Sequence, residues 1–586
     1  MPIIGKNTFA EALSLHKVGL RSLAIPLMKL LRIERINKIY DRLKHNNGIE
    51  FLDACLEELQ ITYDVPPNDL KNIPASGPVV FVANHPYGGL DGIILIRLIS
   101  KVRPDLKVMA NFILKQVEPL QDFFIPVDPF ERTNSTQKSL AGTKKTLEIL
   151  KSGGAVGVFP AGEVSAFYTN RKKISDKPWN PIIGKLILKS GAKVVPVYFS
   201  GCNSLLFNLL GLIHPRLRTA RLPSELLNKK EFHVGIRIGK PINNEELQEF
   251  KDISTLMRFL RAKTYALGSS FEVKKNYFAS PLRAKTNPEP VIEPVEQQVL
   301  EEEINRIRVD NLVITFNQYE LYFCYSTAIP NTIREIGRLR EITFREVGEG
   351  TNRAIDIDEF DLYYHHLFIW DTTEKRIIGA YRLGKGADLF QKFGVKGFYI
   401  NTLFHISSRF FPILKQSIEL GRSFIVKDYQ QKVFVLYLLW RGILTFMRNN
   451  PEYRYLIGPV SISNNFLKVS KSILVHFIKK HYWDAEMASM VRQRKPFKVR
   501  LSSIDAEILL ERNQNSSLKG IDDIISELEP QSFKVPILLK KYLKQNARII
   551  AFNIDPKFNN ALDGFIVMDF QSIPEDTLQM LEKQNS

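Results

Sequence analysis

The sequence predicts an α/β protein with two domains, and three observations support this prediction. The chain has 586 residues, which is too many for a single hydrophobic core. From residue 79 onward, short β-branched runs alternate with helical segments, as in a sheet whose faces are covered by helices. A proline-rich, charged stretch at residues 280–298 separates this pattern from a second one. We therefore expect a first domain at residues 1–270, a flexible linker at 271–305 and a second domain at 306–586.

The first domain opens with an amphipathic segment and continues with five predicted strands. Residues 20–43 place Leu and Ile at helical spacing with Lys and Arg between them, which predicts a basic helix. Such a helix either packs on its own domain or lies on a membrane surface. The predicted strands are "VVFVA" (79–83), "LKVMAN" (106–111), "GAVGVFP" (154–160), "KVVPVYFSG" (193–201) and "HVGIRIGKPI" (233–242).

The second domain has helices and strands in a different order. A helical pattern at residues 333–347 precedes three apparent strands, and long helical patterns follow at residues 430–448 and 463–480. The three strands are "HHLFIWD" (365–371), "RIIGAYRLG" (376–384) and "RSFIVK" (422–427). Two unlike α/β patterns in one chain suggest two activities or two sites.

Charge and composition limit the class of partner. The formal net charge of +19 favours an anionic partner, such as a membrane surface or an acidic carrier protein. Zinc-finger spacing and aromatic RNA-binding motifs are absent from the sequence, so we expect no nucleic-acid partner. Three widely separated cysteines, Cys55, Cys202 and Cys324, match no metal or disulfide spacing, and we expect no bound metal.

A candidate catalytic pair lies in "FVANHPYGGLDG" (81–92), where a predicted strand ends at His85 and a predicted helix begins near Asp91. A neutral imidazole takes a proton from a hydroxyl through one nitrogen when a carboxylate holds the other. Gly88 and Gly89 allow the loop between them to fold back. In the alternative interpretation, both side chains only cap the helix.

Three further stretches follow in order, and they strengthen the catalytic interpretation: "FFIPVDPFER" (123–132), "VGVFPAGEVSAF" (156–167) and "VVPVYFSGCN" (194–203). Together with the His–Asp block, they resemble the four motifs of the lysophospholipid acyltransferase family, which has the glycerol-phosphate acyltransferase fold. The resemblance covers about residues 75–245. It implies that His85 is the general base and that Asp91 orients it. It also implies that the substrate is bound by Arg132, Phe159, Pro160, Gly162 and Glu163.

The sequence departs from that family at three places. The family usually has four residues between His and Asp, and this chain has five. Asp128 stands in the second block, where the family often has an arginine, and Glu163 and Val164 replace Thr and Arg in the third. Family basic residues at these places hold a phosphate, which a carboxylate would repel. We therefore hypothesise an acceptor without phosphate that bears an amine. The alternative is that Glu163 pairs with a nearby arginine such as Arg171.

The second domain carries an acidic and basic pattern between residues 339 and 384, followed by "ELGRSFIV" (419–426). With the tail at residues 535–570, it resembles the acyl-homoserine-lactone synthase branch of the GNAT-like acyltransferases, and more closely the ornithine-lipid N-acyltransferases. The resemblance covers roughly residues 310–575. It implies catalytic carboxylates at Asp358, Asp361 and Glu419, and substrate-binding residues at Arg340, Phe344, Asp371, Arg382 and Arg422. The alternative for each acid–arginine pair is a structural salt bridge.

The two resemblances together imply a fused ornithine-lipid synthase with an O-acylating domain first and an N-acylating domain second. The second domain would join a 3-hydroxyacyl group to an amino acid, and the first would acylate the hydroxyl of the resulting lyso-aminolipid. The acyl donor would be acyl carrier protein or acyl-CoA, and no cofactor would be bound. A cytoplasmic location on the inner face of the membrane follows from the basic charge, the missing signal peptide and the missing long apolar run.

Three alternatives stay open. One is a glycine-lipid or other acylamino-acid lipid synthase. Another is a 1-acylglycerol-3-phosphate acyltransferase. The third, from a different class, is a membrane-surface binding protein with degenerate transferase domains.

Overall fold

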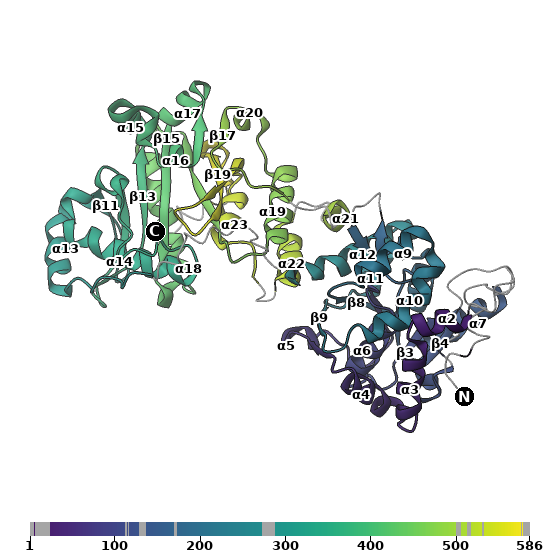
Figure 1. Ribbon diagram of the computed structural model, residues 1–586. Coiled ribbons are helices and arrows are strands. Elements are labelled where there is room, and N and C mark those ends of the chain that lie inside the picture. Colours follow the sequence, from purple (N-terminus) through teal and green to yellow (C-terminus); the bar gives the residue numbers. More distant parts are fainter. Residues whose placement is uncertain are drawn as a thin grey trace. The chain divides into compact units, whose positions relative to one another are not determined.

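The structure of this protein is a computed structural model, and it divides the chain into two compact units (Figure 1). Unit 1 comprises Met1–Lys274 and Leu501–Gln514, and unit 2 comprises Lys275–Arg500 and Asn515–Ser586. The described residues are 5, 24–111, 114, 116–127, 136–168, 173–271, 288–499, 506–511, 517–529, 533–575 and 577.

Unit 1 is built on a seven-stranded sheet in the order β1-β9-β8-β2-β5-β3-β4. All neighbouring strands are parallel except β8 and β9, which are antiparallel. The strands are β1 (Thr62–Asp64), β2 (Val79–Ala83), β3 (Lys107–Asn111), β4 (Phe124–Val127), β5 (Ala155–Val158), β8 (Lys193–Phe199) and β9 (His233–Ile238). A separate hairpin pairs β6 (Ala166–Tyr168) with β7 (Lys173–Ser175).

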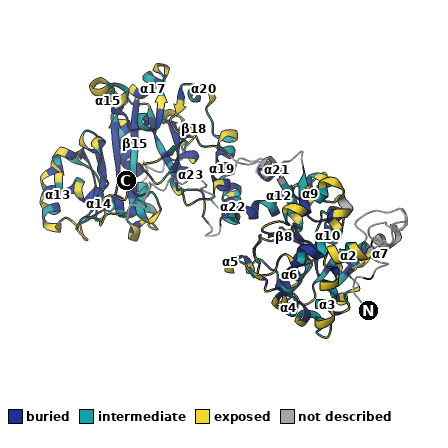
Figure 2. Ribbon diagram, viewed as in Figure 1, coloured by how far each residue is buried: buried dark blue, intermediate teal, exposed yellow. Residues whose placement is uncertain are grey.

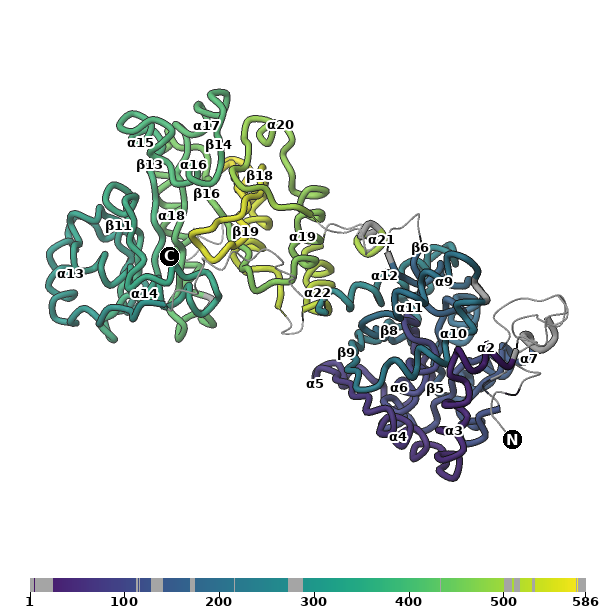
Figure 3. Tube along the Cα trace, viewed as in Figure 1, coloured from purple at the N-terminus to yellow at the C-terminus, as the bar shows by residue number. Residues whose placement is uncertain are grey.

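Helices surround this sheet, as the trace of Figure 3 shows. They are α2 (Ala24–Leu30), α3 (Ile33–Leu43), α4 (Gly48–Glu58), α5 (Pro67–Leu70), α6 (Gly89–Ile99), α7 (Thr136–Lys151), α8 (Pro181–Ser190), α9 (Leu205–Ile213), α10 (Pro215–Leu227), α11 (Asn244–Gln248), α12 (Ile253–Leu267) and α21 (Ala506–Glu511). The central strand β2 is buried along its whole length, because α6 packs on one of its faces and α12 on the other. A parallel strand covered on both faces has a continuous run of apolar residues, so the sequence "VVFVA" predicted this strand.

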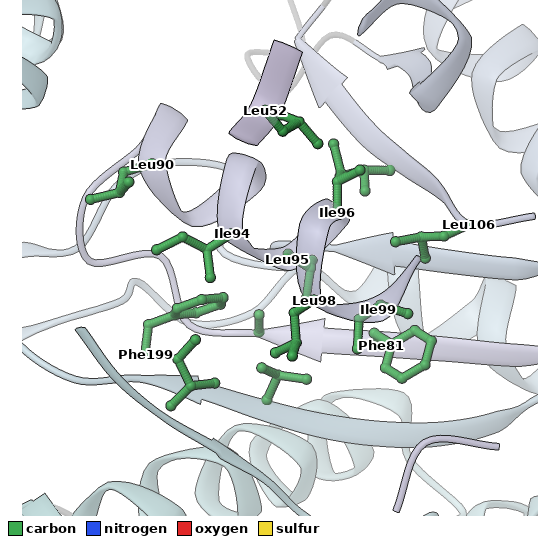
Figure 4. Close-up of a cluster of buried hydrophobic side chains, with 14 of the residues drawn as sticks. Leu52, Phe81, Leu90, Ile94, Leu95, Ile96, Leu98, Ile99, Leu106 and Phe199 are labelled. Atoms are coloured by element: carbon green, nitrogen blue, oxygen red, sulfur yellow. The ribbon is translucent and has the colours of Figure 1, made fainter. Parts of the chain in front are cut away.

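The main core of unit 1 lies between β2 and α6 (Figure 4). Leu95 of α6 is fully buried beside Phe81 and Phe199 of the sheet. Gly157 of β5 leaves room for it, since a Cβ there would lie 3.0 Å from a Leu95 methyl group. This core fixes the carboxyl end of β2 against the start of α6.

The basic segment at residues 20–43 is not one helix. α2 ends at Leu30 and α3 begins at Ile33, because Arg32 adopts a left-handed conformation with φ of 55°. The prediction of a single helix was therefore wrong, and residues 20–23 lie outside the described part of the chain.

Unit 2 is built on an eight-stranded sheet in the order β10-β11-β12-β13-β15-β16-β19-β18. Its strands are β10 (Leu312–Phe316), β11 (Tyr319–Tyr325), β12 (His365–Asp371), β13 (Arg376–Lys385), β15 (Ser417–Ile425), β16 (Tyr455–Ile462), β18 (Arg548–Asp555) and β19 (Ala561–Asp569). Every neighbouring pair is antiparallel except β15 and β16. A small sheet pairs β14 (Phe404–Ile406) with β17 (Val491–Gln493).

The helices of unit 2 leave the central strands β12 and β13 almost entirely buried (Figure 2). They are α13 (Gln297–Asn311), α14 (Pro330–Glu346), α15 (Gly386–Phe393), α16 (Ile400–Leu403), α17 (Phe411–Lys415), α18 (Val433–Asn449), α19 (Lys468–His481), α20 (Ala485–Ala488), α22 (Leu518–Leu528) and α23 (Ile537–Lys544). Within the described ranges, we find no helix with both the length and the apolar character needed to span a bilayer.

Two segments differ from the predicted boundaries. Residues 288–305, assigned to the linker, belong to unit 2, where α13 buries Leu300 and Ile304 in the core. Helix α21, predicted to belong to the second domain, packs on α12 of unit 1 through the buried run 508–510. Prolines and charges suggested that residues 288–305 form a linker. In both segments, however, the apolar residues determine the unit on which the segment packs.

The substitution Leu95→Ala should lower the free energy of unfolding of unit 1 by about 2–5 kcal/mol, because it leaves a cavity between α6 and the sheet. The same substitution at Leu70, which is 42% exposed, should change it by less than about 0.5 kcal/mol. Calorimetry of both full-length variants checks this. Equal effects of the two substitutions would contradict the packing described.

Candidate active sites

His85 directly follows the end of β2 and meets Asp91 across the glycine loop. The His85 Nδ1 and the Asp91 Oδ2 are 2.9 Å apart. The Asp91 side chain is fully buried, whereas 18% of the His85 side chain is exposed. Gly88 has a φ of 97°, which lets the loop turn back at little steric cost. The five-residue spacing therefore still brings the two side chains together.

Asp91 also holds the loop itself. Its Oδ2 accepts hydrogen bonds from the backbone N–H groups of Tyr87 (2.9 Å) and Gly88 (3.0 Å) at the start of α6. The capping role and the contact with His85 thus exist together. Burial raises the pKa of Asp91, and the hydrogen bond from His85 and the loop N–H groups oppose that rise.

The contact with Asp91 sets the tautomer of His85. A carboxylate only accepts hydrogen bonds, so Nδ1 carries the proton and Nε2 is left as the basic nitrogen. The ring is also held from one face, because Phe159 stacks on it with 4.2 Å between the ring centroids. A neutral imidazole oriented in this way is suited to take a proton from a hydroxyl.

The predicted third block forms the turn that positions Phe159 beside His85. Gly162, with φ of 69°, donates its N–H to the Phe159 carbonyl at 3.0 Å. The Pro160 carbonyl accepts the N–H of Asn180 at 2.9 Å. Pro160 and Gly162 therefore shape the turn, and the Phe159 ring is the part of it that contacts His85.

Asp176 is a residue of this site that the sequence did not indicate. Its buried carboxylate accepts hydrogen bonds from the His85 N–H (3.3 Å), the Ser165 hydroxyl (2.5 Å) and the Trp179 indole N–H (3.0 Å). It thereby ties the His85 backbone to the third block. A lone aspartate 91 residues further along the chain carries no local pattern that could have revealed this contact.

Glu163 is engaged in ion pairs. Its carboxylate lies 2.7 Å from the Lys177 Nζ and 3.2 Å from an Arg218 Nη, and it accepts the Tyr168 hydroxyl at 3.1 Å. The ion-pair alternative is therefore correct, although the partners differ from Arg171, which lies outside the described residues. Two cations therefore neutralise the Glu163 carboxylate. It is not free to bind an amine, and its charge would not repel a phosphate nearby.

The predicted second block cannot be placed. Asp128 and Arg132 lie outside the residues that the structure describes. Substrate binding by Arg132 stays a prediction.

In unit 2, three aspartates and three arginines from four parts of the chain form one ion-pair network. It joins α14, the segment after it, β13 and β15. The contacts are Arg340–Asp356 (2.9 Å), Arg340–Asp361 (2.9 Å), Arg382–Asp358, Arg382–Asp361 (3.3 Å), Arg422–Asp358 (2.8 Å) and Arg422–Asp356 (3.4 Å). Opposite charges are equal in number, so the network is neutral within itself.

This network makes Asp361 a weak base, contrary to our expectation. Burial acts to raise its pKa, but the charges of Arg340 and Arg382 outweigh burial and hold the pKa well below its usual range. Asp358 also pairs with two arginines, yet 24% of its side chain is exposed. Among the three aspartates, Asp358 alone is substantially accessible to a ligand, since Asp356 and Asp361 are buried.

Glu419 of β15 has the opposite environment. Its carboxylate accepts the Tyr364 hydroxyl and the N–H groups of Tyr399 (3.0 Å) and Ile400 (2.6 Å). Burial raises the pKa of Glu419 to about 7, although these donors and Arg382 oppose the shift. The pKa of Glu419 therefore suits proton transfer near neutral pH, whereas that of Asp361 does not.

Phe344 lies beside the ion-pair network, whereas Asp371 lies away from it. Phe344 of α14 packs edge-to-face with Phe558, whose ring lies under the Arg422 guanidinium at 4.2 Å, so Phe344 supports the network. Asp371 ends β12, whereas the network lies near its start. There it accepts the Tyr429 hydroxyl (2.8 Å) and two backbone N–H groups of a turn. The structure therefore places Asp371 apart from the network, in a turn at the far end of the strand, and substrate binding by Asp371 stays a prediction.

Glu419 lies at the end of the short pairing between β15 and β16. β15 and β16 pair in parallel over only three residues each, and Glu419 opposite Ile457 is the last pair. A bulge in β15 against β13 contains Arg422, whose φ is 52°.

Comparison with known proteins agrees with two acyl-transfer sites. Residues 8–274 match the family model described as "Acyltransferase", and residues 339–441 match "Acetyltransferase (GNAT) domain". The protein is an acyltransferase. It carries an acyltransferase domain followed by a C-terminal GNAT domain in a two-domain α/β architecture.

This acyltransferase is similar to two kinds of curated relative. It is 29% identical over 304 residues to the "Glycine N(alpha)-acyltransferase" of Bacteroides thetaiotaomicron, covering 49% of this chain and 88% of the relative. It is 26% identical over 249 residues to the "Lyso-glycine lipid O-acyltransferase" of Phocaeicola vulgatus, covering 41% of this chain and 86% of the relative. A solved Thermotoga maritima 1-acyl-sn-glycerophosphate acyltransferase is 14% identical with a TM-score of 0.27, covering 46% of this chain and 99% of its own.

Asp91→Asn should lower kcat/KM for O-acylation about 10²- to 10⁴-fold, because asparagine cannot stabilise the imidazolium that forms on His85. Steady-state assays with a lysolipid acceptor measure the effect. The matched control is Asp64→Asn, which disturbs the exposed pair of Asp64 and His233 in the same unit and should leave the rate unchanged. A comparable loss in both variants would contradict a specific role for the His85–Asp91 pair.

Glu419→Gln should change how the stability of unit 2 depends on pH. The folded-state pKa is raised from 4.5 to about 7, so the contribution of this carboxyl is fully present below pH 4.5 and is lost as pH rises through 7. The wild-type melting temperature should therefore fall, relative to that of the variant, as pH rises through 7. A constant difference between the two proteins across this range would contradict the raised pKa.

Proposed function

We propose that this acyltransferase makes a phosphate-free aminolipid in two steps. Unit 2 would transfer a 3-hydroxyacyl group to the amine of an amino acid, and unit 1 would acylate the hydroxyl of that product. The observation that carries the proposal is that one chain has relatives named for each step, a glycine N-acyltransferase and a lyso-glycine lipid O-acyltransferase. We assign the first name to unit 2 and the second to unit 1, because the GNAT match lies in unit 2.

We propose glycine as the acylated amino acid, in place of ornithine. Both kinds of relative are named for glycine. The sequence favoured a head group with an amine because Glu163 looked free, and the ion pairs with Lys177 and Arg218 remove that reason. An N-acylated glycine keeps a carboxylate and no amine. Lys177, whose side chain is 51% exposed, is available to that carboxylate.

In unit 1, the geometry supports direct transfer to a hydroxyl. The hydroxyl oxygen would attack the thioester carbonyl while the His85 Nε2 takes its proton, forming a C–O bond and breaking the C–S bond. The proton then passes from His85 to the departing thiolate. Asp91 would stabilise the imidazolium between these steps, and Phe159 would keep the ring in place.

In unit 2, the amine would attack the donor thioester directly. The exposed edge of Asp358 would bind the ammonium form of the amino acid, and Arg422 beside it would bind the carboxylate. Glu419, whose pKa is about 7, would first take a proton from the ammonium to give the free amine. Attack would then form the C–N bond and break the C–S bond, and the remaining amine proton would pass to the departing thiolate.

The donor in this proposal is acyl carrier protein or acyl-CoA. Both are acidic, and the net charge of +19 would attract either. We further propose that the protein works at the inner face of the cytoplasmic membrane, because the lyso-aminolipid is an amphiphile and anionic lipids attract a basic protein.

The proposal is tested by producing the protein in a bacterial host that lacks aminolipids and reading the extracted lipids by mass spectrometry. We expect a diacylated glycine lipid from the wild type and accumulation of its mono-acylated form from Asp91→Asn. An ornithine head group would overturn the choice of amino acid. An unchanged lipid profile from well-expressed protein would overturn the proposed function.

The same extracts and purified protein address the remaining alternative. A 1-acylglycerol-3-phosphate acyltransferase would acylate lysophosphatidic acid in vitro and restore growth of a strain deficient in that step. The net positive charge around Glu163 is compatible with a phosphate, so this control is needed. Efficient turnover of lysophosphatidic acid without N-acyl products would overturn the proposed function.

A further inference from the structure

Helix α9 of unit 1 exposes an unusual amount of apolar surface. Five of its nine residues are large apolar side chains that are 48–76% exposed, and Leu217 continues the surface on α10 at 41%. The five are Leu205, Leu206, Leu209, Leu212 and Ile213. Their spacing of one, three, three and one residues places them on one side of the helix. Contiguous apolar surface of this kind marks an interaction site.

The opposite side of α9 is firmly packed, so the exposure is not that of a loose helix. Phe207 is fully buried, and Asn208 accepts the Phe167 N–H at 3.0 Å. The Ser204 hydroxyl caps the helix by accepting the Phe207 N–H at 3.2 Å. The fold therefore holds the leucines outward in a fixed arrangement.

The neighbours of α9 contact the loop of the His85 site. In the loop from β8 to α9, the Ser200 carbonyl accepts a hydrogen bond from the Tyr87 hydroxyl, and the Asn203 amide donates one to the Tyr87 carbonyl. α10, which packs on α9, places Leu222 against Gly88 of the His85–Asp91 loop. Helix α9 and the His85–Asp91 loop therefore belong to one packed region of unit 1.

Exposed basic residues lie on the helices that follow α9 by contact. Near α9 itself, Arg218 and Lys229 are buried, so the exposed cations come from the neighbouring elements. α10 also contacts α3, where residues 24–44 contain six Lys or Arg and two acidic residues. Within that segment, Ile25 and Leu30 of α2 are 55% and 74% exposed. The elements α9, α10, α3 and α2 follow one another by contact (Figure 3).

We propose that the apolar side of α9 inserts into the head-group region of an anionic lipid membrane, so that His85 faces the lipid surface. Leucines at this spacing bury into the boundary of acyl chains and head groups, and the flanking cations contact anionic head groups. The inference rests on the proposed function only for its biological purpose, because membrane binding can be measured without any activity.

A lipid surface fits α9 better than a protein partner. The exposed side has no charge and no hydrogen-bonding side chain, whereas an acidic carrier protein requires cations at the centre of its contact. A second copy of the chain would bring a second set of cations against the first. An anionic bilayer satisfies the apolar centre and the basic surroundings together.

The first test is sedimentation of the full-length protein with vesicles of phosphatidylethanolamine and phosphatidylglycerol. Leu209→Glu combined with Leu212→Glu should weaken binding about tenfold or more, because two charges would enter the apolar boundary. The matched control places the same change at Val309 and Leu362 of unit 2, which are 91% and 67% exposed. Unchanged binding by the α9 variant, or equal weakening by the control, would overturn the proposal.

A second test reads the helix directly. In Leu209→Trp, the emission of the new tryptophan should shift to shorter wavelength on adding these vesicles and be quenched by brominated acyl chains. The same substitution at Val309 should show neither change. Absence of both changes at position 209 would overturn the proposal, as would light scattering that shows a dimer broken by the α9 glutamates.

Activity separates this inference from the proposed function. With an acceptor held in vesicles, the α9 variant should lose O-acylation about in proportion to its binding, whereas a soluble short-chain acceptor should be turned over at the wild-type rate. Vesicle binding without any O-acylation would overturn the function and leave the docking surface standing. O-acylation of the vesicle acceptor that survives the glutamates would overturn docking through α9 alone.

Discussion

The buried carboxylate of Asp91 is the interaction on which unit 1 depends. One oxygen of this group accepts hydrogen bonds from the loop N–H groups of Tyr87 and Gly88 and from the His85 imidazole. Its complete burial is costly, and those donors offset the cost. The same contacts close the glycine loop, begin α6 and fix the tautomer of His85. The conformation of the loop and the basic Nε2 of His85 therefore both depend on the Asp91 carboxylate.

Unit 2 also buries carboxylates, and it does so in two different environments. Arg340 and Arg382 hold the pKa of Asp361 well below its usual range, and the ion pairs of this carboxylate join α14 to β13. Glu419 has no close ion pair, and burial raises its pKa to about 7. A carboxylate that is paired with arginine can organise a site, but it cannot readily accept a proton. The two environments lie on neighbouring strands, and this separates structural acids from a proton acceptor.

The sequence predicted the features that local pattern determines. The buried strand "VVFVA", the two α/β patterns and the approach of His85 to Asp91 follow from apolar runs and from a loop rich in glycine. Contacts that depend on distant parts of the chain were missed. Asp176 reaches His85 from 91 residues away, and Glu163 finds its cations in Lys177 and Arg218. Asp371 was grouped with the network because it is near in sequence, although strand β12 carries it to the opposite end of the sheet.

The order of the proposed steps also removes the need for a shared site. The product of N-acylation has one long chain and a charged head group, so it partitions into a lipid surface. A surface confines the intermediate to a thin layer, where its local concentration is far higher than in solution. An O-acylating unit that binds the same surface can then collect the intermediate from any direction. Two units in one chain are sufficient when unit 1 binds that surface, and the apolar side of α9 is the part of unit 1 that would do so.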